Sequence, residues 1–309
     1  MKLPAQGKIH ERIIAIPDPS YPAYVIRGRE KNMMVDAGVN LLGPRYLSSL
    51  GDILGDPGLL DYLFLTHSHY DHLGSAYYLK LHIPSLRIGA HERVAGLLQK
   101  KSVLAMMNQL SGYCAELLPA NTAVEDLTLR PFAIDLRLKQ GDEFDLGGLT
   151  CRVYATPGHT RDSLAFYVPQ IKALFAGEAV GVMQAETGAD LQVEFLSSYE
   201  DYINSLKLLI TLKPEIICLA HGWVLTGEDG TDFLRQSLAA TFRYRVLVES
   251  YLDAAGGNVE RAAREMAHAE YDVKGSIFQE RTAYLTNLNA QVKHIAELRD
   301  NTSSQGSLP

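Results

Sequence analysis

The chain contains little cysteine and no cluster of basic residues. Its 309 residues include only Cys114, Cys151 and Cys218, which lie far apart. An odd number of widely spaced cysteines does not predict a disulfide framework. The formal net charge is −7, and no segment is rich in Lys and Arg. Because phosphate binding needs clustered cations, we expect no nucleic-acid partner.

The chain also lacks a long apolar run. Its apolar segments are far shorter than the roughly 20 residues that a transmembrane helix needs, so no membrane partner is expected. The first residues, Met1 to Lys8, contain neither the hydrophobic segment nor the small-residue cleavage site of a secretory signal. We therefore expect a cytoplasmic protein. Its hydrophobic content of 47% is typical of a packed globule.

What the chain does contain is a dense group of metal-ligand side chains. His67, His69, Asp71 and His72 stand within six residues, directly after the apolar run Leu63–Leu65. Three neighbouring buried imidazoles would each need a hydrogen-bond partner, and they would repel one another once protonated. Imidazole suits zinc, iron and copper, and a carboxylate adds an oxygen ligand. The group therefore predicts a site for one or two divalent cations.

Three further candidate ligands stand where other strands are expected to end. His159, Glu178 and His221 each follow shortly after an apolar, strand-like run. In layered α/β folds, ligands gather beyond the carboxyl ends of strands. Each of these residues also has a glycine beside it, which permits a tight turn. We therefore expect these side chains to share one site with the histidine cluster.

The expected elements form an α/β core. Strands are expected at residues 9–16, 24–27, 32–35, 62–65, 86–88, 150–155, 164–168, 173–175 and 216–219. Helices are expected at about 44–54, 73–81, 92–100 and 102–118. A further helix begins at a capping-box pattern, Ser197 to Glu200, and runs to about Leu212.

Everything after His221 has a helical pattern. One long helix is expected to end at Gly256 and Gly257. Its apolar face is formed by Leu234, Leu238, Phe242, Val246 and Leu252. Asn258 can cap a helix at 259–269, and Ser276 with Gln279 can cap a last helix to about 298. We expect a core at 1–225, a helical appendage at 226–300 and a disordered tail at 301–309. The long helix could pack on its own core or on a second subunit, so a homodimer is left open.

The segment Thr66–Gly74 resembles the His-x-His-x-Asp-His motif of the metallo-β-lactamase superfamily. The other motifs of that superfamily are matched, in order, by Val35–Gly38, Thr156–Thr160, Gly177-Glu178 and His221. The resemblance covers about residues 8–225. It implies a four-layer αββα sandwich with two mixed β-sheets facing each other, helices outside and a binuclear site at one edge. The helical appendage would follow this core.

The resemblance also implies roles for the candidate ligands. It assigns one cation to His67, His69 and His159 and the other to Asp71, His72 and His221. The superfamily usually has Asp, as a carboxylate that bridges both metals, where this chain has Glu178. Glu is one methylene longer, so the metals shift, Glu178 binds only one of them, or the second site is weak. We expect Glu178 to be a ligand, and the alternative is that it only orients a ligand without touching metal. Asp71 would also orient the attacking hydroxide. Asp36 would brace a ligand loop or serve only in a turn.

The implied activity is hydrolysis by a hydroxide held on two divalent metal ions, with zinc expected first and iron or manganese as alternatives. The layout resembles the 2-aminobenzoylacetyl-coenzyme A thioesterase branch of the superfamily, which also has a helical C-terminal region. We therefore expect an acyl thioester or ester small molecule as the substrate. A lactonase or a phosphodiesterase on the same fold is the alternative. A second hypothesis is that the biological role is not catalysis. The chain would then be a regulatory or interaction protein that acts through its helical appendage.

Overall fold

The computed structural model describes two compact units. The residues outside the description are 17, 19, 116–117, 119–124, 184–190, 276, 278–280 and 306–309, together with the side chains of 301–305. The first unit, here the sheet unit, comprises Met1–Ala155, Asp162–Gly177 and Pro214–Gly230. The second, here the helical unit, comprises Thr156–Arg161, Glu178–Lys213 and Thr231–Pro309. The domain boundaries expected from the sequence stay predictions.

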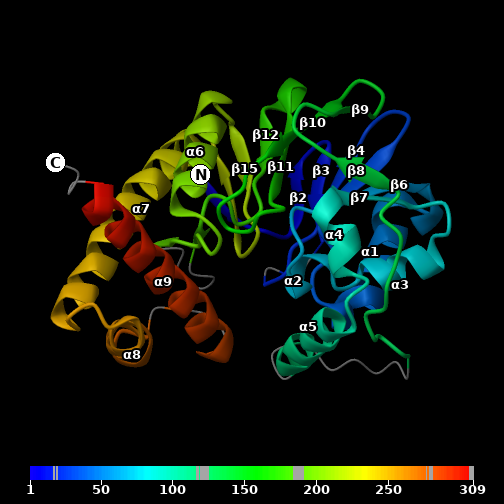
Figure 1. Ribbon diagram of the computed structural model, residues 1–309. Helices are drawn as coiled ribbons and strands as arrows, with labels where there is room; N and C mark the ends of the chain where they lie inside the picture. Colours follow the sequence, from blue (N-terminus) through cyan, green and yellow to red (C-terminus); the bar gives the residue numbers. More distant parts are fainter. Residues whose placement is uncertain are drawn as a thin grey trace. The chain divides into compact units, whose positions relative to one another are not determined.

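Two seven-stranded sheets form the sheet unit (Figure 1). The first has the order β2-β3-β4-β5-β6-β7-β8, with β2 Gly7–His10, β3 Ile13–Ala15, β4 Tyr24–Arg27, β5 Asn32–Val35, β6 Leu60–Phe64, β7 Arg87–His91 and β8 Leu136–Leu138. The second has the order β1-β16-β15-β12-β11-β10-β9, with β1 Lys2–Pro4, β9 Glu143–Asp145, β10 Thr150–Ala155, β11 Leu164–Val168, β12 Ala173–Phe175, β15 Ile216–Cys218 and β16 Trp223–Thr226. Strands β5 to β8 are parallel, as are β12 and β15, so both sheets are mixed.

Alternating side chains of the central strands belong to two different apolar cores. On β5, Met33 belongs to one buried cluster and Met34 to the other. On β6, Phe64 belongs to the cluster that also contains Phe166 of the second sheet, and the two rings lie 5.5 Å apart. Successive side chains of a strand point to opposite faces, so these strands are covered on both sides. The two sheets therefore face each other across one core.

The second core lies between the first sheet and a set of helices (Figure 1). The helical segments of the sheet unit are η1 Asn40–Leu42, α1 Gly43–Leu54, η2 Pro57–Leu59, α2 Tyr70–Leu73, α3 Ala76–His82, α4 Glu92–Leu97, α5 Lys101–Tyr113 and η4 Pro169–Ile171. Pro44 stands in the first turn of α1, where its missing N–H costs no intrahelical hydrogen bond. Tyr46 and Leu50 of α1 are fully buried in this core.

The helical unit contains β13 Val182–Met183, β14 Leu191–Gln192, α6 Tyr199–Thr211, α8 Val259–Ala267, η5 His268–Val273 and α9 Arg281–Gln305. It also contains α7 Glu228–Ala254 from Thr231 onward. Asn258 caps α8, as expected, because its Oδ1 accepts the backbone N–H of Arg261 at 2.9 Å. No helix in the described ranges combines the length and the apolar content that spanning a bilayer would require.

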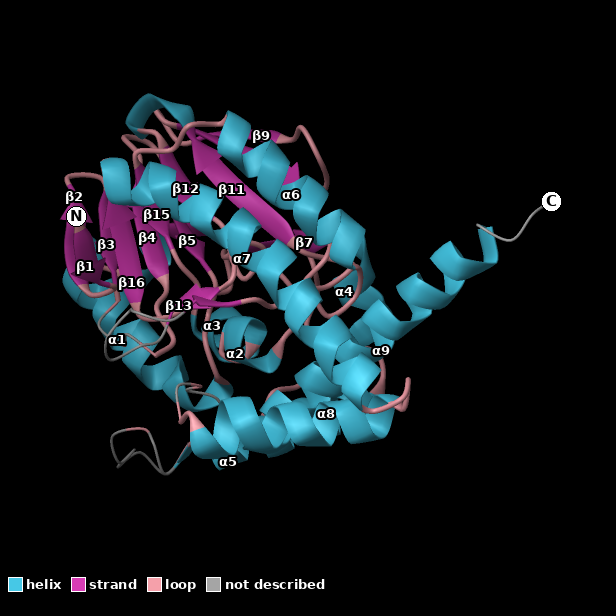
Figure 2. Cartoon of the chain, turned by 90° about the vertical axis from the view of Figure 1, so that its left-hand side faces the viewer, coloured by secondary structure: helices cyan, strands magenta, loops and turns pink. Residues whose placement is uncertain are grey.

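The prediction that the chain is helical throughout after His221 was wrong. Residues Trp223–Thr226 form β16, which pairs with β15 on one side and with β1 on the other (Figure 2). Tryptophan, valine and threonine favour strands, and an open edge of β15 gives them backbone partners. The helix that follows begins only at Glu228.

The buried face of α7 includes only part of the expected apolar face. Leu234 and Leu252 of the expected apolar face are buried, whereas Phe242 and Val246 are 46% and 65% exposed in the single chain. The buried stripe instead includes Ser237 and Thr241. Their hydroxyls donate to the carbonyl oxygens of Val180 and Ser237, which removes the cost of burying them. The face buried within the chain is therefore only partly the apolar face expected from the sequence.

Two expected helix ends differ from the structure as well. The cap of α6 is Ser198, which accepts the backbone N–H of Asp201, and not Ser197. Helix α9 continues to Gln305, into the segment expected to be disordered. The sequence has no Pro or Gly between Arg281 and Gln305 that would stop a helix. The expected cap at Ser276 and Gln279 lies outside the described residues.

Candidate metal centre

The histidine cluster begins just after β6 and continues into α2. This segment is hydrogen-bonded to the loop that follows β5, because Ala37 N donates to His72 O at 2.7 Å and Gly74 N donates to Gly38 O at 2.8 Å. A Cβ added to Gly74 would lie 2.7 Å from the Gly38 carbonyl oxygen. Only glycine permits this close approach of the two loops.

Asp36 joins the two loops through its side chain. Its Oδ1 accepts the Thr66 N–H at 2.8 Å, and its Oδ2 accepts the Thr66 hydroxyl at 2.9 Å and His72 Nδ1 at 2.9 Å. The residue is 5% exposed and has a φ of 60°, a conformation that Asp and Asn adopt more readily than most side chains. Asp36 therefore braces the ligand loop, the first of the two roles expected from the sequence.

Four of the candidate ligand histidines donate through Nδ1. The acceptors are Thr66 Oγ1 for His67 at 3.0 Å, Asp36 Oδ2 for His72 at 2.9 Å, Glu194 O for His159 at 2.6 Å and Ser20 O for His221 at 2.6 Å. Carboxylate and carbonyl oxygens only accept, so these bonds place the proton on Nδ1. Thr66 gives its own hydroxyl proton to Asp36 and accepts from His67. Each neutral ring then has a lone pair on Nε2, which is how a metal-ligating histidine is prepared.

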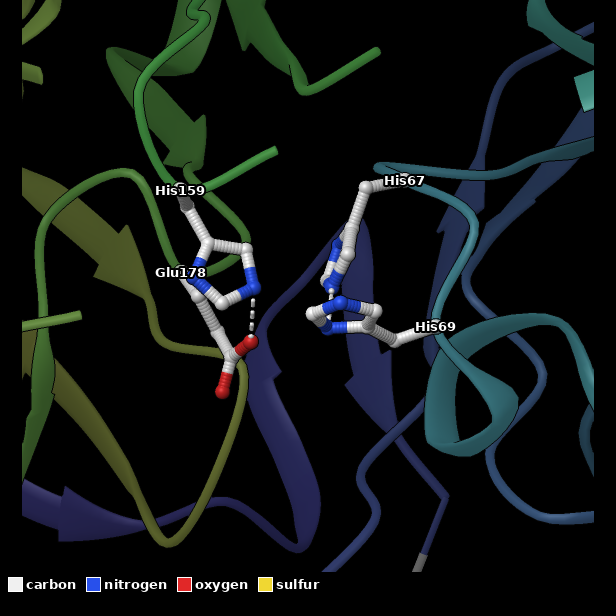
Figure 3. A group of neighbouring side chains, drawn as sticks. All are labelled: His67, His69, His159 and Glu178. Atoms are coloured by element: carbon white, nitrogen blue, oxygen red, sulfur yellow. Dashed lines mark hydrogen bonds and ion pairs between the residues drawn. The ribbon is translucent and has the colours of Figure 1, made fainter. Parts of the chain in front are cut away.

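His69 is oriented differently. Its Nδ1 lies 3.0 Å from Nε2 of His67, and the two rings are 4.6 Å apart at 75° (Figure 3). Because His67 already holds its proton on Nδ1, its Nε2 offers a lone pair toward His69. Two imidazole nitrogens that converge in this way suit a single cation.

The first ligand group consists of His67, His69, His159 and Glu178. Each offers one ligand atom, and these atoms all lie within 4.8 Å of one another. His159 Nε2 and Glu178 Oε2 are 2.6 Å apart (Figure 3). Three imidazole nitrogens and one carboxylate oxygen are a donor set that zinc, iron or manganese accepts. The residues present therefore fit a divalent cation.

The second ligand group consists of Asp71, His72 and His221, whose ligand atoms also lie within 4.8 Å of one another. Asp71 Oδ2 lies 4.0 Å from His72 Nε2 and 3.7 Å from His221 Nε2. The two imidazole rings are 5.4 Å apart. This donor set fits a second divalent cation. The two groups together contain all seven side chains expected from the sequence, and their roles as metal ligands stay predictions.

Some residues that shape the centre were not found from the sequence. The carbonyl groups of Ser20 and Glu194 orient two histidines, and a carbonyl carries no sequence signal, because every residue has one. Tyr21 lies edge-on to His221 with ring centroids 6.1 Å apart, and its hydroxyl donates to Cys114 Sγ at 3.2 Å. Burial raises the pKa of Tyr21 far above its ordinary value. The Tyr21 hydroxyl is therefore a neutral donor at physiological pH.

Comparison with known families agrees with this geometry. The family model described as the metallo-beta-lactamase superfamily matches residues 18–221. The match begins before β4 and ends on His221, so it spans all seven candidate ligands.

Two relatives and one solved structure illustrate the similarity. The metallo-beta-lactamase fold-containing protein ST1585 of Sulfurisphaera tokodaii is 28% identical over 224 residues, which cover 70% of this chain and 78% of the relative. The acyl-coenzyme A thioesterase MBLAC2 of Bos taurus is 26% identical over 198 residues, or 61% of this chain and 67% of the relative. The structure of the metallo-beta-lactamase family protein TTHA1429 from Thermus thermophilus covers 96% of this chain and 95% of its own, with a TM-score of 0.66 and 19% identity. At that identity the structural match supports the fold alone.

Proposed function

Because the chain belongs to the metallo-beta-lactamase superfamily, we propose that it is a metal-dependent hydrolase of a small acyl thioester or ester. The observation that carries the proposal is the arrangement of seven side chains in two ligand groups, with four histidines held in the Nδ1-protonated form. A set of neutral imidazoles and carboxylates without clustered Lys or Arg is suited to cations.

Each ligand group would hold one of the two cations. His67, His69, His159 and Glu178 would hold one cation, and Asp71, His72 and His221 would hold the other. Bound divalent cations would polarise the substrate carbonyl and lower the pKa of a water molecule.

Asp71 has the clearest role among the protein groups. Its carboxylate lies within 4.0 Å of Nε2 of both His72 and His221. One oxygen can bind a cation while the other accepts a proton from the attacking water. Asp36 keeps the loop in register through Thr66 and His72.

The choice of a thioester rests on the relatives and on the layout. A relative that covers 61% of this chain is named as an acyl-coenzyme A thioesterase. The sequence also resembles a thioesterase branch with a helical C-terminal region, and here α7, α8 and α9 follow the last candidate ligand. We also propose a cytoplasmic location, because three widely spaced cysteines do not predict a disulfide framework. The homodimer and the lack of a nucleic-acid partner stay predictions.

A substrate panel tests the proposed function. The metal-loaded protein is assayed against acyl-coenzyme A thioesters, aryl esters, lactones and a phosphodiester. We expect turnover of thioesters or esters that is lost after chelation, restored by added metal and abolished in His69→Ala. His82→Ala is the control, because His82 belongs to neither ligand group and its ring packs on Tyr78 of α3. Turnover of lactones or phosphodiesters alone would replace the thioester proposal. If no substrate is turned over and a cellular phenotype survives His69→Ala, the binding-protein hypothesis would take the place of the enzyme.

A further inference from the structure

The orientation of His221 depends on a residue 201 positions away. His221 Nδ1 donates to the Ser20 carbonyl oxygen at 2.6 Å. Ser20 lies in the loop between β3 and β4, whereas His221 follows β15. A loop from a distant part of the chain therefore holds the imidazole ring, and a shift of Ser20 would release it.

The loop is held on the N-terminal side of Ser20 by an ion pair. Arg45 Nη1 lies 3.1 Å from Asp18 Oδ2, and the Asp18 carboxylate is buried, with 7% of its side chain exposed. The other oxygen, Oδ1, accepts the backbone N–H of Tyr21 at 3.3 Å. Asp18 therefore joins the loop to Arg45 of α1 and also bonds to the backbone of Tyr21 within the same loop.

The loop is held on the C-terminal side of Ser20 by a buried phenol. Tyr46 Oη donates to the carbonyl oxygen of Tyr21 at 2.6 Å. Tyr46 is fully buried, and burial raises its pKa well above the ordinary value, so the hydroxyl remains a donor. Arg45 and Tyr46 are adjacent residues of α1, and they hold the loop at Asp18 and at Tyr21, on either side of Ser20.

We propose that Asp18, Arg45 and Tyr46 are positioning residues that fix the Ser20 carbonyl and, through it, the tautomer and direction of His221. The inference rests on the proposed function, since it concerns the ligand group formed by Asp71, His72 and His221. It makes α1 the element that sets the affinity of that group for its cation. Partners that orient a ligand histidine change metal affinity by about 10- to 100-fold when they are lost.

The direct test is Tyr46→Phe, which removes one hydroxyl and keeps the ring. Zinc and cobalt titrations against a competing chelator give the affinity of each binding step, and the cobalt absorption spectrum reports ligand geometry. We expect one of two steps to weaken by about 10- to 100-fold, with the other unchanged. Tyr78→Phe is the matched control, because Tyr78 is also buried and its hydroxyl donates to Glu125 at 2.6 Å, away from Ser20. The control should leave both steps unchanged.

A double-mutant cycle separates positioning from general damage. In a His221→Ala background, Tyr46→Phe should have no further effect on metal affinity, since its route to the metal has been removed. Equal weakening in both backgrounds, or equal weakening of both steps, would overturn the inference. Arg45→Met provides a second variant should Tyr46→Phe fail to fold, because the Arg45 side chain is 37% exposed, and the same selective weakening is expected. A wild-type protein that binds no metal would overturn the proposed function, whereas two unaltered binding steps in the variants would overturn only the positioning role.

Discussion

Asp36 connects three donors of the metal loop, namely the N–H and hydroxyl of Thr66 and Nδ1 of His72. Its positive φ is also accessible to asparagine, so Asp36→Asn can change the side-chain chemistry while keeping the backbone. The amide has one acceptor oxygen, whereas the carboxylate uses both of its oxygens here. The amide NH₂ group must then face either the Thr66 N–H or the Thr66 hydroxyl and His72 Nδ1, all of which are donors.

We expect Asp36→Asn to weaken metal binding by about 10- to 100-fold and to lower the free energy of unfolding by about 1–3 kcal/mol. Metal titration and urea unfolding measure the two effects. Asp135→Asn is the matched control, because Asp135 Oδ2 accepts the Ile88 N–H at 2.8 Å but lies on a different segment. Equal metal affinity in wild type and Asp36→Asn would show that the brace does not act on the ligands.

The sequence predicted the candidate ligand side chains of the centre better than the groups that orient them. The ligands could be found because imidazole and carboxylate side chains are rare in such density, as between His67 and His72. The oxygens that orient His159 and His221 could not be found, since they are backbone carbonyls of Glu194 and Ser20. Only the fold brings those carbonyls to the rings.

At the scale of elements, strands that end beside a turn residue were predicted best. The bounds of β4, β5, β10, β11 and β12 agree with the expected ranges, because each of these mostly apolar runs is followed within three residues by Gly or Pro. Strand β16 was missed because its four residues stand between His221 and a long helical pattern. The segment is a strand because it pairs with β1 and β15. A local sequence pattern carries no information about such pairing.

The cap of α8 gives a prediction at this scale. Asn258→Ala removes the acceptor of the Arg261 N–H and should lower the free energy of unfolding by about 1 kcal/mol. Asn289→Ala is the control, because Asn289 is an exposed residue within α9, where alanine is the better helix former. Urea unfolding of both variants measures the difference. An equal loss of stability in both would contradict the capping role.

At the scale of the whole molecule, buried phenols make stability depend on alkaline pH. Burial raises the pKa of Tyr24, Tyr46 and Tyr244 well above the ordinary value, and burial with a hydrogen bond to Glu125 raises the pKa of Tyr78 to about 12. A raised pKa means that the folded state holds the proton more tightly than the unfolded state. This stabilisation is fully present below the ordinary pKa of about 10 and is lost as the pH rises through the raised values.

We therefore expect the urea midpoint to fall progressively as the pH rises above 10. Absorbance at about 295 nm should show that only part of the 16 tyrosines ionises in the folded protein near pH 11. The remainder should ionise on unfolding. If all 16 tyrosines ionised with ordinary pKa values while the protein stayed folded, that result would contradict the burial of these phenols.

The central claim is that the seven side chains form a centre for two cations. The most direct measurement is the number of metal ions per chain, by elemental analysis after loading with zinc, iron or manganese and removal of excess metal. We expect two ions in the wild-type protein and one in His69→Ala, which loses a ligand of the first group but leaves Asp71, His72 and His221 intact. A wild-type chain that retains no metal, or a His69→Ala variant that retains both ions with unchanged affinity, would contradict it.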